Sequence, residues 1–175
     1  NSSSWTFVDG NVSTGINKAT GNNATNPAMA VLSTKLYLAW SETNADNRTQ
    51  IRVKSYDGSS WSFVDGDNVT KGINKDYTQN ASYPQLVKVT DNSSSSKLYA
   101  VWLEENGNTQ VRVAEFNGTS TWSFKDGDSF DGLNLNTAKI TGKPSAVAHL
   151  YNLIVAWSET NSLGVPQIRV AKSPF

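Results

Sequence analysis

The sequence repeats itself three times, and this repetition limits the possible folds more than any other feature. Each copy begins with W-[ST]-F, at Trp5, Trp61 and Trp122, and continues through D-G, G-[IL]-N, a Pro, an apolar run ending in Trp, a Glu and Q-[IV]-R-V. The starting points lie roughly 60 residues apart, and repeats of about 40–60 residues built from short strands are typical of β-propeller blades. We therefore expect an all-β fold made of repeated sheets.

One complete copy predicts four antiparallel strands. Runs rich in Val, Leu, Tyr, Phe and Trp cover residues 84–89, 98–102, 110–116 and 122–124, and clusters of Asn, Gly, Ser and Asp separate them. The second run is apolar on both faces, which is typical of an inner strand covered on two sides. The third and fourth runs are joined by D-G or N-G, the strongest short hairpin signals.

The segment after each W-[ST]-F must cross to the next sheet. D-G ends the outer strand, and we expect Asp9, Asp65 and Asp126 to cap these turns. In the G-[IL]-N element that follows, the Gly is expected to supply an unusual backbone angle and the Asn to tie the loop to itself. We expect the apolar residues between them to fill the gap between neighbouring sheets; these are Ile16, Ile73 and Leu133.

These motifs resemble a repeat common in secreted bacterial β-propellers, and are more distantly similar to Asp-box and propeller-lectin blades. The similar elements are W-x-F, the D-G turn, G-I-N and A-W-S-E. The resemblance covers nearly the whole chain. It implies a β-propeller of four-stranded antiparallel blades, with three blade equivalents per chain in repeats of approximately 5–60, 61–121 and 122–175, and a secreted or extracellular location.

The strands do not divide evenly into blades. The chain has one spare outer strand, from Trp5 to Phe7, and a third copy without an outer strand. Three blades are fewer than the four to eight that usually close around a channel. We expect the 175 residues to form a single propeller unit whose Trp5–Phe7 strand completes the last blade of another subunit, giving a six-bladed homodimer. The alternative is that the chain is an excised or engineered part of a longer propeller.

Charge and composition exclude several classes of partner and chemistry. Fifteen Lys and Arg balance fifteen Asp and Glu, so we expect no nucleic-acid partner. The apolar runs are far shorter than the roughly 20 residues that span a bilayer, so we expect no membrane partner. Cysteine is absent, which excludes disulfides and thiolate chemistry. The D-G-D sequences at 65–67 and 126–128 offer too few oxygens for calcium, and we expect no metal and no cofactor.

The sequence does not favour an enzyme. His149 is the only histidine, and neither of the other copies has one at the equivalent place. A glycosidase needs one site with two carboxyl groups that differ in pKa. Glu42, Glu104 and Glu159 instead recur in equivalent positions. Threefold repetition is typical of architecture or of multivalent binding.

A repeated set of Trp, Glu, Gln and Arg is the candidate ligand site. Period-two geometry places Trp and Glu on one face of the second strand and Gln and Arg on one face of the third. A ring beside a carboxylate and a guanidinium can hold a sugar, and fucose-type propeller lectins use similar residues. The set comprises Trp40, Glu42, Gln50, Arg52, Trp102, Glu104, Gln110, Arg112, Trp157, Glu159, Gln167 and Arg169. The alternative is a structural Glu–Arg pair tying two strands together beneath a buried Trp.

We therefore expect a non-enzymatic, lectin-like propeller that binds glycans at repeated sites. Weak sites repeated around a ring would gain avidity. A structural or protein-interaction propeller without a small ligand is the alternative, and a glycosidase-like fragment is the third possibility.

Overall fold

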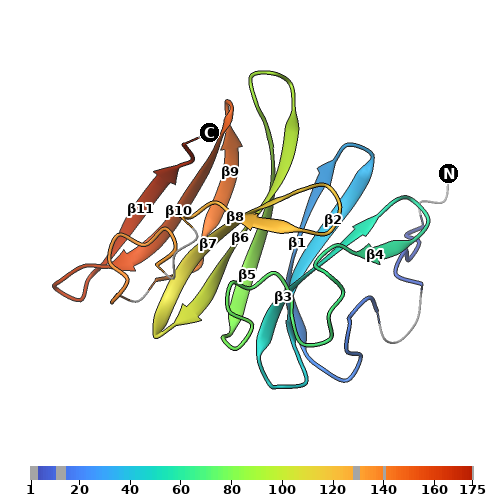
Figure 1. The fold of residues 1–175 in the computed structure, drawn as a ribbon, viewed down its shortest axis with the longest axis horizontal. Coiled ribbons are helices and arrows are strands. Elements are labelled where there is room, and N and C mark those ends of the chain that lie inside the picture. The colour runs from blue at the N-terminus through green and yellow to red at the C-terminus, as the bar shows by residue number, and fades with distance from the viewer. Residues whose placement is uncertain (1–3, 11–14, 128–130, 140, 175) are drawn as a thin grey trace.

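The computed structural model describes residues 4–10, 15–127, 131–139 and 141–174, and these form eleven β-strands and no helix. The strands are arranged in three antiparallel sheets (Figure 1). Sheet 1 contains β1 (Ala24–Leu32), β2 (Lys35–Thr43), β3 (Thr49–Tyr56) and β4 (Trp61–Phe63). Sheet 2 contains β5 (Ala81–Thr90), β6 (Ser96–Asn106), β7 (Asn108–Phe116) and β8 (Trp122–Phe124). Sheet 3 contains β9 (Ser145–His149), β10 (Asn152–Thr160) and β11 (Pro166–Lys172).

Local sequence explains the order of strands within each sheet. Sheets 1 and 2 follow chain order from first to fourth strand, and sheet 3 follows it for three strands. The turns between third and fourth strands place Gly58 and Gly118 at φ values of 104° and 94°, which only glycine adopts readily. The four strands predicted for one repeat are confirmed, although β5 and β6 extend beyond the predicted runs because their polar ends still pair.

Sheet 2 lies between sheets 1 and 3 (Figure 1). Two apolar clusters fill the spaces on either side of it. The first joins sheets 1 and 2 and includes Tyr37, Ile51, Leu98 and Phe116. The second joins sheets 2 and 3 and includes Val111 and Leu153 among its buried members. The first strands of neighbouring sheets also contact each other, β1 with β5 and β5 with β9.

Burial on both sides of sheet 2 agrees with the predicted inner strands. In β6, the seven residues from Leu98 to Glu104 are all buried. The third strand of sheet 3 is less covered than those of sheets 1 and 2. Ile51 and Val111 are 0% exposed, whereas the equivalent Ile168 of sheet 3 is 75% exposed.

The crossing segments bind the third strand of the sheet that they leave. Ile73 donates its N–H to the carbonyl of Ile51, and Leu133 donates to Val111. Ile73 is buried and Leu133 packs against the second cluster, as expected.

Two details of the crossing segments differ from the expectation. The Asn does not bind its own loop alone, because the Asn74 side chain accepts the N–H of Ile51 and donates to Thr49, both on β3. Gly132 has a positive φ of 60°, but Gly72 does not. Gly72 is needed for another reason: a Cβ there would lie 2.1 Å from the Ile51 carbonyl oxygen.

The three sheets do not close into a ring, and β11 has no fourth strand beside it among the described residues. The segment containing Trp5 and Phe7 is not a strand in this single chain, and both side chains are largely exposed. It lies beside sheet 1 instead, where the Trp61 indole donates to the Val8 carbonyl at 2.9 Å. Trp122 donates to Val64 in the same way at 2.9 Å. The contact of this N-terminal segment with sheet 1 is therefore equivalent to the contact of the end of β4 with sheet 2.

We predict that Gly72→Ala destabilises the chain while Gly21→Ala does not. The added methyl group at position 72 would meet the Ile51 backbone, which cannot rotate away, whereas nothing lies within 4 Å of a Cβ at Gly21. Overpacking of this kind costs about 1–3 kcal/mol. Chemical denaturation of both variants measures the difference, and equal stability would contradict the assigned contact.

Candidate functional site

The structure places most of the predicted Trp–Glu–Gln–Arg set inside the protein. Trp and Arg lie directly opposite each other on the second and third strands, and Glu lies opposite Gln. In sheets 1 and 2 all eight residues are buried; they are Trp40, Glu42, Gln50, Arg52, Trp102, Glu104, Gln110 and Arg112. The strand geometry predicted from the sequence is therefore confirmed.

Each glutamate of the set holds the crossing segment that enters its own sheet. The Glu104 carboxylate accepts the N–H groups of Lys75 and Asp76 at 2.9 and 2.8 Å, and the indole of Trp102 at 2.9 Å. Burial raises the pKa of Glu104 above its ordinary value, although these three donors favour the ionised form. The carboxylate thus links a strand to a loop.

The other two glutamates make equivalent contacts. Glu42 accepts from Lys18, Ala19 and the Trp40 indole. Glu159 accepts from the backbone of residues 135 and 136 and from the Trp157 indole. The glutamate thus recurs together with one contact, in which its carboxylate holds the crossing segment.

Each arginine of sheets 1 and 2 pairs with an aspartate that follows the fourth strand. Arg52 Nε lies 2.9 Å from Asp65 Oδ2, and Arg112 Nε lies 3.1 Å from Asp126 Oδ2. The side chains of all four residues are at most 3% exposed. Asp65 also accepts the N–H of Asp67, so it caps its turn as predicted, but its main partner is the arginine.

Sheet 3 departs from this pattern. Trp157 and Glu159 are buried, but Gln167 is exposed and Arg169 is half-buried. The Gln167 side chain donates to the carbonyl of the neighbouring Pro166, whereas the equivalent Gln50 reaches the crossing segment at Tyr77. Within the described part of the chain, sheet 3 is thus the sheet whose third strand still presents part of the repeated set to solvent.

These contacts bear on both interpretations of the set. A sugar could reach the polar atoms in sheets 1 and 2 only by displacing contacts within the protein, so the ligand role of these residues stays a prediction. The structural alternative predicts a pair between Glu and Arg. The structure instead joins Glu to Trp and backbone N–H groups, and Arg to Asp.

A different cleft, between sheets 2 and 3, presents polar and aromatic groups to solvent. It has a volume of about 220 Å³. The Glu115 carboxylate lies in it and contacts Lys97 Nζ at 2.7 Å, Tyr99 Oη at 2.9 Å and Lys125 Nζ at 3.4 Å. Tyr151, from the β9–β10 turn, also lines the cleft and is 55% exposed.

Both carboxyl groups of this cleft are held in the ionised form. Burial works to raise the pKa of Glu115, but the hydrogen bonds from Lys97 and Tyr99 and the charge of Lys125 outweigh it and lower the pKa. Asp91 accepts hydrogen bonds within its own loop, from the Ser93 hydroxyl and from backbone N–H groups, and these lower its pKa as well. The cleft therefore contains ionised acceptors and two partly exposed lysine donors.

The repeated motifs do not reveal this cleft, because the repeats do not share its charged residues. Glu115 corresponds to Ser55 in the first copy and to Lys172 in the third, and Lys125 corresponds to Val64. A departure from the repeat could have indicated the site: the second copy has Glu115 and Lys125 where the other copies have no residue of the same charge.

The remaining predicted features lie away from this cleft. His149 is exposed at the end of β9. Within the described ranges, no group of three or more His, Asp or Glu side chains is placed to hold a metal. The described residues also contain no helix that could cross a membrane. Asp128, part of the second D-G-D, lies outside the described residues.

Comparisons with known proteins give a distant structural similarity. No protein-family model matches the chain, and no curated protein matches it. A solved complex of BT0996 with RGII superposes with a TM-score of 0.49 and 10% sequence identity. The alignment covers 87% of this chain and 53% of the solved one, so the chain spans about half the length of that structure.

We predict that Glu104→Gln lowers stability far more than Glu105→Gln. An amide at position 104 turns an NH2 group toward N–H donors that need an acceptor, whereas Glu105 is exposed. Hydrogen bonds to a charged group contribute about 1.5–3 kcal/mol each, so a loss of at least roughly 2 kcal/mol is expected. Urea denaturation checks this, and equal midpoints would show that the carboxylate does not hold the loop.

Proposed function

We propose that the three sheets are blades of a β-propeller and that the chain is a secreted, non-enzymatic protein that binds carbohydrate. Support for the propeller comes from the consecutive antiparallel sheets, whose first strands are neighbours. The equivalent crossing contacts between sheets support it as well. The binding site of this proposal is the cleft around Glu115.

The cleft has the chemistry that a sugar requires. The Glu115 carboxylate can accept hydrogen bonds from sugar hydroxyls, and Lys97, whose side chain is 49% exposed, can donate to them. Tyr151 offers a half-exposed ring on which the C–H face of a sugar can stack. Small-ligand sites typically combine such an apolar surface with a few placed polar groups.

The lowered pKa of both carboxyl groups of the cleft supports the non-enzymatic part of this proposal. A glycosidase needs one carboxyl group with a raised pKa to protonate the leaving group. The pKa values of Glu115 and Asp91 are both lowered. Neither group is tuned to act as the acid, whereas both suit a site that only binds.

A protein-interaction propeller is the second candidate. The outer faces of sheets 1 and 3 favour it, because apolar residues such as Met29, Ile168 and Val170 are more than 60% exposed. A glycan array separates the two candidates: no signal for any sugar with the folded protein would favour the interaction scaffold. Hydrolysis of an aryl glycoside would contradict both.

We predict that Glu115→Gln and Tyr151→Ala each weaken binding to a glycan found on the array. Loss of a hydrogen bond to a charged group costs about 1.5–3 kcal/mol, which corresponds to about a ten- to hundredfold weaker association for the first variant. Tyr77→Ala and Glu105→Gln are controls outside the cleft. Titration calorimetry measures the constants, and unchanged binding in both cleft variants would refute the assigned site.

We also predict that binding persists on mild acidification. A lowered folded-state pKa means that more than half of Glu115 is ionised at about pH 4.3, the ordinary pKa of a glutamate. The midpoint of the decline in affinity should therefore lie below that pH. A fluorescence titration across the acid range checks this, and a midpoint above the ordinary value would contradict the assigned role of Glu115.

A further inference from the structure

We propose that the sugar bound in the cleft around Glu115 is an acidic one, and that Lys125 binds its carboxylate or sulfate group. The site is the one proposed above, so this assignment of the sugar class rests on that function. The charges of the cleft carry it. Each carboxyl group of the cleft has donors of its own, and Lys125 is the cation that neither of them requires.

The Glu115 carboxylate has close donors other than Lys125. Its Oε1 accepts from Lys97 Nζ at 2.7 Å, and its Oε2 accepts from Tyr99 Oη at 2.9 Å. Lys125 Nζ lies 3.4 Å from Oε2, whereas a hydrogen bond between an ammonium and a carboxylate is usually about 2.7–2.9 Å long. Lys97 already balances the charge of Glu115, so Lys125 is in surplus.

Asp91, the other carboxyl group of the cleft, takes its donors from its own loop. Its Oδ1 accepts the N–H groups of Ser93 and Ser95 at 2.9 Å and the Ser93 hydroxyl at 2.7 Å. The Ser93 hydroxyl is the largest cause of its lowered pKa, and Lys97 is the lysine whose charge adds to that effect. Asp91 therefore does not account for Lys125 either.

Lys125 occupies a position that another copy of the repeat uses for packing. Its backbone N–H donates to Val113 at 2.8 Å, as that of Val64 donates to Val53 at 3.0 Å. The two residues are therefore equivalent, but Val64 is buried in the first apolar cluster and Lys125 is exposed. An ammonium adds nothing to such packing, so the lysine is explained by what it offers to solvent.

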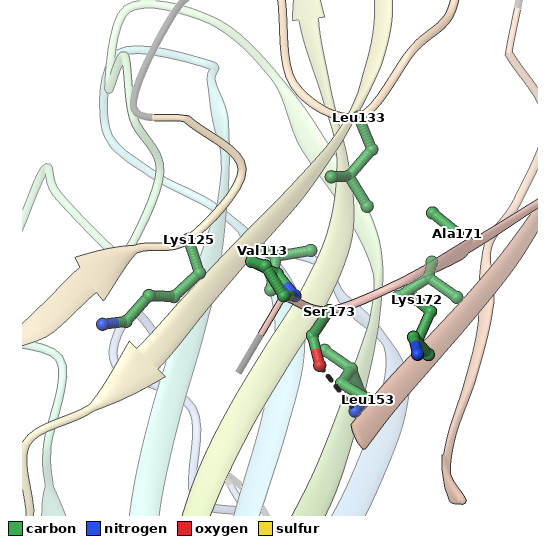
Figure 2. A pocket seen from close by; sticks show the side chains of 9 residues that line it. Val113, Lys125, Leu133, Leu153, Ala171, Lys172 and Ser173 are labelled. Carbon is green, nitrogen blue, oxygen red and sulfur yellow. Dashed lines mark hydrogen bonds between the residues drawn. The ribbon is translucent and has the colours of Figure 1, made fainter.

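The ammonium of Lys125 is directed to the cleft. Lys125 lines an apolar hollow together with Val113, Leu133 and Leu153, and its ammonium points away from these side chains (Figure 2). The same lysine also lines the cleft around Glu115. Its stem thus packs on apolar groups while its charged end stays in water, and the side chain is 33% exposed. A ligand in the cleft can therefore reach the ammonium.

An acidic sugar uses all of these groups. Its hydroxyls can donate to Glu115, and its C–H face can stack on Tyr151. Its carboxylate or sulfate can accept charge-assisted hydrogen bonds from Lys125, and such bonds are about twice as strong as those between neutral groups. A neutral sugar would make the first two contacts but would leave the charge of Lys125 to water.

Matched pairs of sugars test the assignment. Galacturonic acid differs from galactose only at C6, and glucuronic acid differs from glucose in the same way. Glucose 6-sulfate distinguishes a sulfate from a carboxylate. In titration calorimetry at low salt, the acidic member of at least one pair should bind about tenfold more tightly, which is the lower end for a hydrogen bond to a charged group. The preference should decrease as salt is added, because salt screens a partly exposed pair of charges.

Variants of Lys125 assign the preference to its ammonium. Lys125→Met removes the charge and keeps an apolar stem, which the fold accepts at the equivalent Val64. This variant should bind both members of a pair equally, whereas Lys125→Arg should keep the preference. Lys88→Met is the control and should also keep it. Lys88 is exposed on β5, on the face opposite to Val87 and Val89 of the second cluster.

The outcomes distinguish a failure of this assignment from a failure of the proposed function. Tighter binding of the neutral member in every pair would overturn the acidic sugar and leave carbohydrate binding in place. A preference for the acid that survives in Lys125→Met would overturn the role of Lys125. Absence of binding to every sugar of the pairs and of the glycan array would overturn the assignment and the proposed function together.

Discussion

The buried pair between the third-strand arginine and the aspartate after the fourth strand is the contact on which the rest of the repeat depends. Arg52 with Asp65, and Arg112 with Asp126, join the outermost strand of a sheet to its interior. A buried pair of charges gains little net stability, because desolvation offsets most of the attraction. We interpret its main effect as geometric: it fixes where the fourth strand ends and where the crossing segment begins.

The other repeated contacts continue from that point along the chain. The backbone of Ile73 and the side chain of Asn74 bind the third strand, and Glu104 then accepts two backbone N–H groups of the same crossing segment. Backbone donors in a buried loop need partners, and here a single carboxylate supplies them. Each repeat therefore positions its successor. This accounts for the buried contacts that the repeated Trp, Glu and Arg residues make in sheets 1 and 2.

Function in such a molecule is more readily found where the repeats differ. A residue present in every copy can make a contact that every copy contains, whereas Glu115, Lys125 and Tyr151 line a single cleft. The same reasoning applies to sheet 3. Its third strand differs from the other two, because Gln167 is exposed whereas Gln50 and Gln110 are buried.

The sequence by itself determined the strands, their order within a sheet and the facing of Trp to Arg and Glu to Gln, because these follow from period-two alternation and local turn chemistry. It could not determine which of those faces is covered. Trp102 and Glu104 have the same residue types whether a sugar or the neighbouring sheet lies over them, and burial depends on sheets that are distant along the chain. Only the tertiary structure placed Asp65 on Arg52 and Glu104 on the preceding crossing loop, since strand pairing within a sheet and the path of the crossing segment bring these partners together.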